Sequence, residues 1–345
     1  RFIRVAEELG LIVDLGLWVL DTACRQARTW LDSGLSDFTI AVNVSALQLQ
    51  RPTFVADVQA ALDRSGLPPH HLELELTESS IMENVERMVE TMHALKKLGV
   101  LLALDDFGIG YSSLNYLKRF PIDKLKIDQS FVRDVTRDSG DAGIARAIIA
   151  MGHQLQMTVM AEGVETAAQM GYLRRNHCDQ FQGWLFGGPV PTSEAEGLLR
   201  RKFLSPEVFA NNDSGLTILL LDDEENILRS LTRLLRRDGY TILTANNARE
   251  AFDQLGTRDV QVVVSDQRMP DISGTEFLSQ VKALYPETIR LVLSGYTDLK
   301  TVTEAINLGS IYKFLTKPWD DEELRREIRE AFRAYEARRA RDDAA

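Results

Sequence analysis

The order of apolar and polar positions divides the chain into short apolar runs and longer segments with an apolar residue every three or four positions. In the N-terminal half, six runs rich in β-branched and other apolar residues predict strands at 38–45, 72–79, 100–107, 124–128, 158–165 and 181–186. Helical spacing between them predicts helices such as 85–98 and 142–155. Regular alternation of this kind is typical of an α/β fold with a parallel sheet and crossover helices.

We expect the first domain, residues 1–203, to be a (β/α)8 TIM-like barrel that is incomplete at its N-terminus. Six predicted strands are fewer than the eight of a closed barrel. The chain also starts at Arg1, without a methionine, inside an amphipathic segment that resembles the middle of a domain. The sequence therefore predicts an N-terminally truncated barrel.

Residues 204–215 interrupt the pattern with proline, paired asparagines, serine and glycine, which predicts a linker. Over residues 216–340 the alternation restarts on a shorter scale, with five apolar runs that are each followed by a helical pattern. Five strands and five helices predict a flavodoxin-like (βα)5 domain. The chain is thus expected to hold two domains, as its 345 residues also suggest.

Composition narrows the classes of partner. A net charge of -11 argues against a nucleic-acid polymer or an anionic membrane as the main partner. No apolar run reaches the ~18 residues of a transmembrane helix. The two cysteines, Cys24 and Cys178, lack metal-ligand spacing, so we expect small core residues in a cytoplasmic protein.

Polar residues of the first domain share one position, because each lies at or near the carboxyl end of a predicted strand. They are Asn43, Glu75, Asp105, Asp106, Lys126, Glu162 and Gln182. In a barrel these strand ends meet on the face that holds active sites. Clustered carboxylates repel one another unless cations lie between them, and oxygen ligands without His or Cys favour Mg2+ or Mn2+.

The adjacent pair Asp105 and Asp106 suits two metal ions, since one carboxylate can bridge both ions while the other binds the second ion. Two such ions clamp the attacking and leaving oxygens of a phosphoryl displacement. Lys126 can hold or polarise the attacking water and offsets negative charge. Each residue also has a purely structural interpretation, as a helix cap for the aspartates or as an ion-pair partner for the lysine.

Six motifs occur in order over about residues 1–200: N-V-S, E-L-T-E, D-D-F-G-I-G-Y-S-S-L, L-K-I-D, A-E-G-V-E-T and Q-G-W-L-F. Together they resemble the EAL-domain phosphodiesterases, which hydrolyse cyclic di-GMP to linear pGpG. The resemblance implies that two Mg2+ or Mn2+ ions are bound in the barrel. Its implied ligands are Asn43, Glu75 and Asp105 for the first ion, and Asp106 and Glu162 for the second.

The same resemblance implies that Lys126 positions or activates the water, while Glu165 and Gln182 support the site and the substrate. Glu78 would anchor the loop 107–113, which in the family couples metal binding and dimerisation to activity. The sequence departs from the family at Ile109, where threonine is common. The Glu-Ala-Leu motif with its metal-ligating glutamate would precede the first residue, so we expect weak or no activity from this chain alone and activity from the intact parent.

In the second domain, Asp222 and Asp223 end the first predicted strand and Asp266 ends the third. Ser294 follows the fourth strand and Lys317 the fifth. Ligands of open α/β sheets bind at these carboxyl ends, so the five side chains are expected to converge. Such a group can bind one Mg2+ ion and accept a phosphoryl group on a carboxylate.

This pattern, over about residues 217–335, resembles the receiver domain of bacterial two-component response regulators. The resemblance implies the phosphoacceptor Asp266, an Mg2+ site of Asp222, Asp223 and the Arg268 carbonyl, phosphoryl-binding Ser294 and Lys317, and the switch aromatic Phe314. It also implies a sensor histidine kinase or a phosphotransfer protein as phosphodonor. A flavodoxin-like domain with incidental acids is the alternative, while the absence of G-x-G-x-x-G after a strand disfavours a dinucleotide site.

Together the two resemblances predict a cytoplasmic, homodimeric cyclic di-GMP phosphodiesterase that is regulated by phosphorylation of Asp266. A non-catalytic effector that only binds cyclic di-GMP is the main alternative. A third interpretation, a barrel phosphodiesterase for a glycerol or sugar phosphate, rests on fold and metal type alone.

Overall fold

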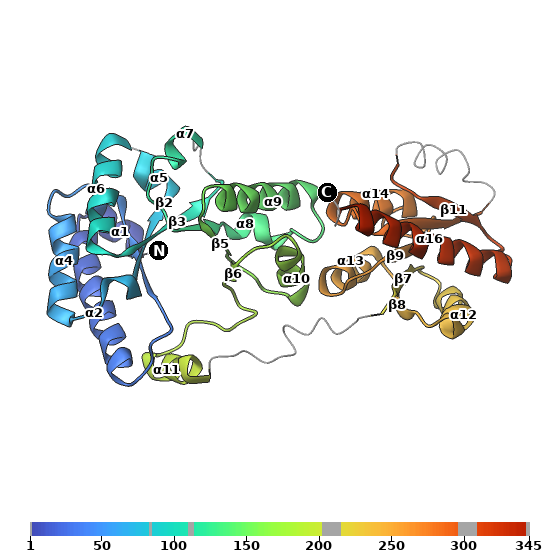
Figure 1. The fold of residues 1–345 in the computed structure, drawn as a ribbon, viewed down its shortest axis with the longest axis horizontal. Coiled ribbons are helices and arrows are strands. Elements are labelled where there is room, and N and C mark those ends of the chain that lie inside the picture. Colours follow the sequence, from blue (N-terminus) through green and yellow to red (C-terminus); the bar gives the residue numbers. More distant parts are fainter. Residues whose placement is uncertain (1, 83–84, 110–113, 202–214, 296–308, 343–345) are drawn as a thin grey trace. The chain divides into compact units, whose positions relative to one another are not determined.

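The computed structural model describes residues 2–82, 85–109, 114–201, 215–295 and 309–342 (Figure 1). Chain contacts divide it into two compact units. The first comprises Arg1–Arg133, Ile144–Glu165 and Asn176–Pro206, and the second comprises Asp134–Gly143, Thr166–Arg175 and Glu207–Ala345. The predicted linker lies, apart from Gly215, outside the described residues.

The first unit contains a parallel sheet whose strands follow one another in chain order (Figure 1). Its strands are β1 (Ile40–Val44), β2 (Leu72–Thr77), β3 (Leu101–Phe107), β4 (Lys124–Ile127), β5 (Thr158–Ala161) and β6 (Gln180–Phe181). The predicted parallel α/β sheet is therefore confirmed.

The helices that lie wholly or mostly in the first unit also follow the predicted pattern. They are α1 (Phe2–Glu8), α2 (Ile12–Asp32), α3 (Ala46–Leu49), α4 (Phe54–Ser65), η1 (Pro69–His71), α5 (Glu78–Met82), α6 (Val85–Leu98), α7 (Leu114–Leu117), α8 (Gln129–Arg133), α9 (Ser139–Gln154) and α11 (Thr192–Arg201). The predicted helix 85–98 is found with the same bounds, and the predicted helix 142–155 begins three residues earlier.

The last predicted strand of this domain is much shorter than expected. Only Gln180 and Phe181 pair with β5. Beyond them Gly183 adopts a φ of 158°, and the amide of Phe186 donates to the carbonyl of Gly183 over 3.1 Å. The chain therefore turns at this glycine, and the prediction of a strand up to residue 186 is wrong.

Strand β2 shows how the sheet separates its two faces. Leu72, Leu74 and Leu76 are fully buried, as expected for a parallel sheet covered by helices. Glu73 and Glu75 alternate with these leucines and are buried as well. Because successive side chains of a strand point to opposite faces, both glutamates point away from the leucine face. That second face carries the polar site.

The second unit contains a five-stranded parallel sheet in the order β11-β10-β9-β7-β8 (Figure 1). Its strands are β7 (Thr217–Leu221), β8 (Thr241–Ala245), β9 (Val262–Asp266), β10 (Ile289–Ser294) and β11 (Lys313–Thr316). This is the 2-1-3-4-5 order of flavodoxin-like folds, which confirms the predicted architecture.

The helices of the second unit are α10 (Ala167–Arg175), α12 (Glu225–Leu235), η3 (Arg236–Asp238), α13 (Ala248–Thr257), α14 (Gly274–Leu284) and α16 (Asp321–Asp342). The helix predicted after the fourth strand falls on residues 296–308, outside the described residues. Leu324, Ile328 and Phe332 of α16 join the strand residues in one buried apolar core. The apolar stripe of α16 thus packs against the sheet.

Both cysteines are free thiols in the interior, as predicted. Burial raises the pKa of Cys24 to about 11 and that of Cys178 to about 12, so both stay protonated at neutral pH. Over the described part of the chain, no helix is both long enough and apolar enough to span a membrane.

Candidate functional site

A local irregularity at the end of β3 explains how two adjacent aspartates face one site. The register between β3 and β4 shifts between Leu104 and Phe107, and Asp106 adopts a left-handed φ of 55°. Bulges of this kind re-aim a side chain next to functional sites, and a non-glycine residue with positive φ costs about 1–3 kcal/mol. As a result, carboxylate oxygens of Asp105, Asp106 and Glu162 lie within 4.8 Å of one another.

Lys126 lies at the centre of this cluster. Its Nζ is 2.9 Å from Glu75 Oε1, 3.1 Å from Asp105 Oδ1 and 2.5 Å from Glu162 Oε1. The carboxylates belong to β2, to β3 and to the residue after β5, and the lysine side chain is only 2% exposed. The structure therefore brings four of the predicted site residues into direct contact and places Asp106 beside them.

The electrostatics of the cluster keep Lys126 charged. Burial lowers its pKa, but hydrogen bonds with Glu162 and Glu75 outweigh burial and the net pKa is raised. A protonated ammonium donates hydrogen bonds and cannot accept a proton. Lys126 is thus suited to orient a water molecule or to neutralise charge, and not to act as a general base at neutral pH.

Two of the carboxylates have raised pKa values in this structure. Burial raises the pKa of Asp106, and the neighbouring charges of Asp105 and Asp128 raise it further. Burial likewise raises the pKa of Glu162, although Lys126 opposes the shift. A carboxylate cluster with raised pKa values gains stability when a cation is added to it.

The chemistry of these side chains fits a hard divalent cation. Among the residues that the structure describes, Asp105, Asp106 and Glu162 form a group whose oxygen atoms are close enough to share an ion. The ammonium group of Lys126 already occupies a cation position among oxygen ligands. Carboxylate oxygens are the preferred ligands of Mg2+ and Mn2+, so the predicted metal type fits the residues present.

Glu78 is buried and holds the backbone that follows the aspartate pair. Its Oε2 accepts a hydrogen bond from the amide of Gly108 over 3.1 Å. Gly108 has a φ of 103°, and a Cβ at this position would lie 2.8 Å from Phe131 Cε2. Ile109 is exposed, and the remaining residues of the predicted loop, 110–113, lie outside the described residues.

Three predicted residues are exposed and are not among the carboxylates that pair with Lys126. Asn43 is in register with Glu75 on the neighbouring strand, but its side chain is exposed. Glu165 and Gln182 are also exposed. The amide of Gln182 donates to the carbonyl of Ala161 over 2.8 Å, which fixes its backbone beside β5.

The structure adds one carboxylate to the residues predicted from the sequence. Asp128 is buried at the end of β4, and its side-chain hydrogen bond with Asp106 contributes to the raised pKa of Asp106. Its Oδ1 also accepts a hydrogen bond from the amide of Ser130 over 2.8 Å. The position of Asp128 directly after β4 is the same strand-end signal that identified the other site residues.

A second buried ion pair lies one layer below the cluster. Lys124 Nζ is 2.7 Å from Glu73 Oε2, and both side chains are buried. These residues precede Lys126 and Glu75 by two positions on the same strands, so their side chains share the same face of the sheet. In the sequence, the alternation of charged residues and leucine in K-L-K and E-L-E corresponds to this shared face.

The second unit has its own polar site at the carboxyl ends of its strands. Lys317 Nζ is 2.8 Å from Asp222 Oδ2 and forms an ion pair with Asp266. The amide of Arg268 donates to Asp266 Oδ2 over 2.8 Å. Burial raises the pKa of Asp222, while Lys317 opposes the shift. The structure thus brings together three of the predicted receiver residues.

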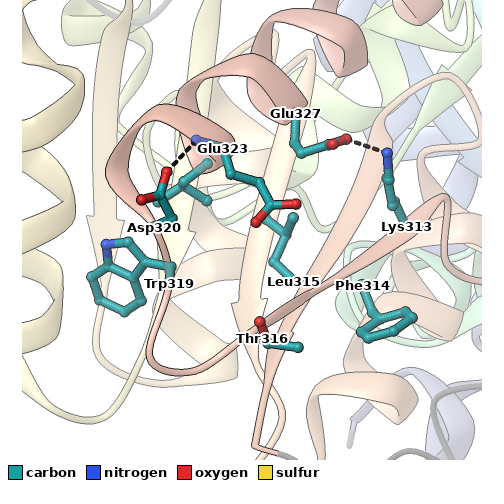
Figure 2. Close-up of a pocket in the computed structure, with 9 residues that line it drawn as sticks. Lys313, Phe314, Leu315, Thr316, Trp319, Asp320, Glu323 and Glu327 are labelled. Carbon is teal, nitrogen blue, oxygen red and sulfur yellow. Dashed lines mark hydrogen bonds and ion pairs between the residues drawn. The ribbon is translucent and has the colours of Figure 1, made fainter.

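The other receiver residues flank this trio. Asp223 is exposed next to Asp222, and Ser294 is buried at the end of β10, where its Oγ donates to the carbonyl of Gly295 over 3.2 Å. Phe314 is half-buried on β11 and lines a cavity of about 170 Å3 between β11 and α16 (Figure 2).

These features define a class of protein: a parallel α/β barrel-type domain with a lysine-centred carboxylate site, followed by a flavodoxin-like domain with an acidic trio and a lysine. Comparison with protein families agrees with this class. Residues 1–189 match the EAL domain, and residues 218–329 match the response regulator receiver domain. The chain belongs to the EAL domain family and carries a C-terminal receiver domain.

Two curated relatives come from Pseudomonas aeruginosa. The chain is 48% identical over 194 residues to the bifunctional diguanylate cyclase/cyclic di-GMP phosphodiesterase MucR, covering 56% of this chain and 28% of MucR. It is 46% identical over 200 residues to the cyclic di-GMP phosphodiesterase NbdA, covering 58% of this chain and 26% of NbdA. The chain thus spans about a quarter of the length of the curated relatives it matches.

Solved structures extend the likeness to the fold. The PaMucR phosphodiesterase in complex with c-di-GMP superposes with a TM-score of 0.55 at 48% identity, over 56% of this chain and 78% of that chain. The EAL domain of Mycobacterium smegmatis DcpA gives a TM-score of 0.53 at 39% identity, over 55% of this chain and 86% of that chain. The predicted family and fold are therefore confirmed.

Proposed function

We propose that the EAL domain hydrolyses cyclic di-GMP to linear pGpG with Mg2+ or Mn2+, and that phosphorylation of the receiver on Asp266 regulates this reaction. The observation that carries the proposal is the burial of Lys126 among Glu75, Asp105 and Glu162, with Asp106 beside them. The names of the relatives MucR and NbdA support the choice of substrate.

Two metal ions would be held by the side chains at the strand ends. Asn43, Glu75 and Asp105 would bind one ion, and Asp106 and Glu162 would bind the other. Divalent ions bound there would supply stabilisation of the negative charge on the phosphodiester and a lowered pKa for bound water. The bulge at Asp106 supports this assignment, because it directs two adjacent carboxylates to one site.

The remaining side chains would orient the reactants. Lys126 is protonated, so it would donate hydrogen bonds to the attacking water and offset the charge of the carboxylates. Glu78 would hold the backbone after Asp106 through Gly108. Glu165 and Gln182, which are exposed near the ends of β5 and β6, would contact the substrate.

In the receiver, Asp266 would accept a phosphoryl group from a sensor histidine kinase or a phosphotransfer protein. Asp222, Asp223 and the Arg268 carbonyl would bind one Mg2+ ion. Ser294 and Lys317 would bind the phosphoryl oxygens, and Phe314 would be the switch aromatic. The contact of Lys317 with both Asp222 and Asp266 supports this assignment. We also propose that the protein acts as a homodimer.

The decisive experiment incubates the full-length protein with cyclic di-GMP and Mn2+ and separates the products by chromatography. We expect linear pGpG to accumulate, Asp105→Ala to abolish it, and Asp63→Ala, an exposed residue of α4, to leave it unchanged. Tight binding of cyclic di-GMP without turnover would instead identify a non-catalytic effector. Absence of both binding and turnover would overturn the proposed substrate.

A further inference from the structure

A second cavity of the receiver, with a volume of about 550 Å3, lies between α12 with η3 and the start of α16. Four arginines line it: Arg233, Arg236, Arg237 and Arg325. One acidic residue, Asp321, is found among the described residues of its lining. The chain as a whole has a net charge of -11, so this cavity is a local reversal of the overall charge.

Three of the four arginines lack an ion-pair partner within the described part of the chain. Arg325 donates from Nη2 to the carbonyl of Leu234 over 2.8 Å, and its Nε lies 3.5 Å from Asp238 Oδ2. In contrast, Arg233, Arg236 and Arg237 are exposed and have no hydrogen bond or ion pair with any residue that the structure describes. Neighbouring like charges repel, and an anion between them removes this cost.

An aromatic ring completes the cavity. Trp319, which is half-buried, lies on the segment between β11 and α16 and lines both this cavity and the smaller one. Figure 2 shows the ring at the smaller cavity. Guanidinium groups bind phosphate oxygens in pairs of parallel hydrogen bonds. Tryptophan provides a flat face on which a nucleobase can stack. The volume falls within the range of about 300–1,000 Å3 for small-molecule sites.

We propose that this cavity binds a nucleotide, with its phosphate groups held by Arg233, Arg236 and Arg237 and its base stacked on Trp319. A concave site between two helices suits a small ligand, whereas a nucleic-acid polymer would require an extended basic surface. The site lies within the receiver and is distinct from the phosphoacceptor Asp266 and from the barrel cluster.

The test measures binding of GTP and ATP to the full-length protein by calorimetry in the presence of EDTA, which removes metal-dependent binding at the other sites. We expect micromolar binding of at least one of them, and a loss of about tenfold or more in the double variant Arg233→Ala/Arg237→Ala. Arg229→Ala is the matched control, because Arg229 lies on the same helix but pairs with Glu225 at 2.8 Å and does not line the cavity.

Trp319→Leu separates a nucleotide site from a simple anion site. We expect this variant to bind the nucleotide several-fold more weakly, while its binding of inorganic pyrophosphate stays unchanged. Circular dichroism of each variant checks the fold. No binding of either nucleotide at millimolar concentration overturns the proposal, as does binding that the arginine variant leaves unchanged. Pyrophosphate that binds as tightly as GTP overturns the role of the base.

Discussion

The amide of Gly108 donates a hydrogen bond to Glu78 Oε2 over 3.1 Å. This contact joins the first residue after β3 to the first residue of α5, which directly follows β2. Glu78 is 4% exposed, so the bond is shielded from water. It therefore constrains the backbone immediately after the metal-binding candidates Asp105 and Asp106.

Glu78→Ala should reduce the diesterase rate without unfolding the domain. Loss of a hydrogen bond to a charged group is worth about 1.5–3 kcal/mol, which corresponds to roughly 10- to 100-fold in rate if the bond holds the catalytic geometry. Glu78→Gln keeps an acceptor oxygen, so its diesterase rate should lie between that of the unmodified protein and that of Glu78→Ala. Steady-state kinetics of the full-length protein measure this, and a normal rate in Glu78→Ala would show that the contact has no catalytic role.

Gly108→Ala should destabilise the same region. Its φ of 103° disfavours a side chain, and the new Cβ would lie 2.8 Å from Phe131 Cε2, so we expect a loss of about 1–3 kcal/mol. Gly143→Ala is the matched control, since Gly143 lies in α9 with open space around its Cβ position. There we expect a gain of about 0.5–1 kcal/mol. Urea unfolding measures the free energy of unfolding of both variants. Equal changes in Gly108→Ala and Gly143→Ala would refute backbone and steric strain at position 108.

Much of the fold and of the cluster follows from the sequence, because both depend on short-range patterns. Apolar runs locate the strands, and parallel strands of one sheet bring their carboxyl ends together, so Glu75, Asp105 and Lys126 could be assigned to one site. Tertiary geometry decided the rest. The bulge at Asp106 depends on pairing between β3 and β4, and Asp128 gains its role only through its contact with Asp106.

Lys126→Met should reveal the cation requirement of the cluster. Removal of the ammonium leaves three carboxylates facing one another, and an uncompensated buried charge costs about 3–5 kcal/mol. We expect this loss in EDTA and partial recovery in Mn2+, because the ion replaces the missing charge. Lys124→Met is the matched control: it breaks the buried pair with Glu73, and no recovery by Mn2+ is expected. Urea unfolding measures the free energy of unfolding of both variants. If Mn2+ restored it equally in both, the ion would not bind specifically at the cluster.

Asp266→Asn should abolish phosphorylation of the receiver. With acetyl phosphate and Mg2+, we expect the unmodified protein to gain one phosphoryl group by intact mass, and the variant to gain none. Lys317→Ala should still accept a phosphoryl group on Asp266, but phosphorylation should change the diesterase rate only weakly, because the contacts of Lys317 with Asp222 and Asp266 are lost. Asp271→Asn, near the site in sequence, serves as control. Phosphorylation that persists in Asp266→Asn would assign the acceptor to another residue.

Glu327 should make the stability of the receiver depend on pH in the acidic range. Burial raises its pKa, but hydrogen bonds from Lys313 and Arg326 outweigh burial, and the net pKa is lowered. The folded state therefore releases this proton more readily than the unfolded state, whose pKa is about 4.3. The stabilisation is present above that value and is lost as pH falls through the folded-state pKa.

We accordingly expect Glu327→Gln to reduce the free energy of unfolding at pH 7 by about 1–3 kcal/mol, and to lose this difference progressively below about pH 4. Glu330→Gln is the matched control, because Glu330 is half exposed and lies 3.8 Å from the same Lys313, so its effect should stay within about 0.5 kcal/mol. Urea unfolding of the full-length protein between pH 3 and 7 measures both. A constant difference between Glu327→Gln and the unmodified protein across this range would show that the ionisation of Glu327 does not stabilise the fold.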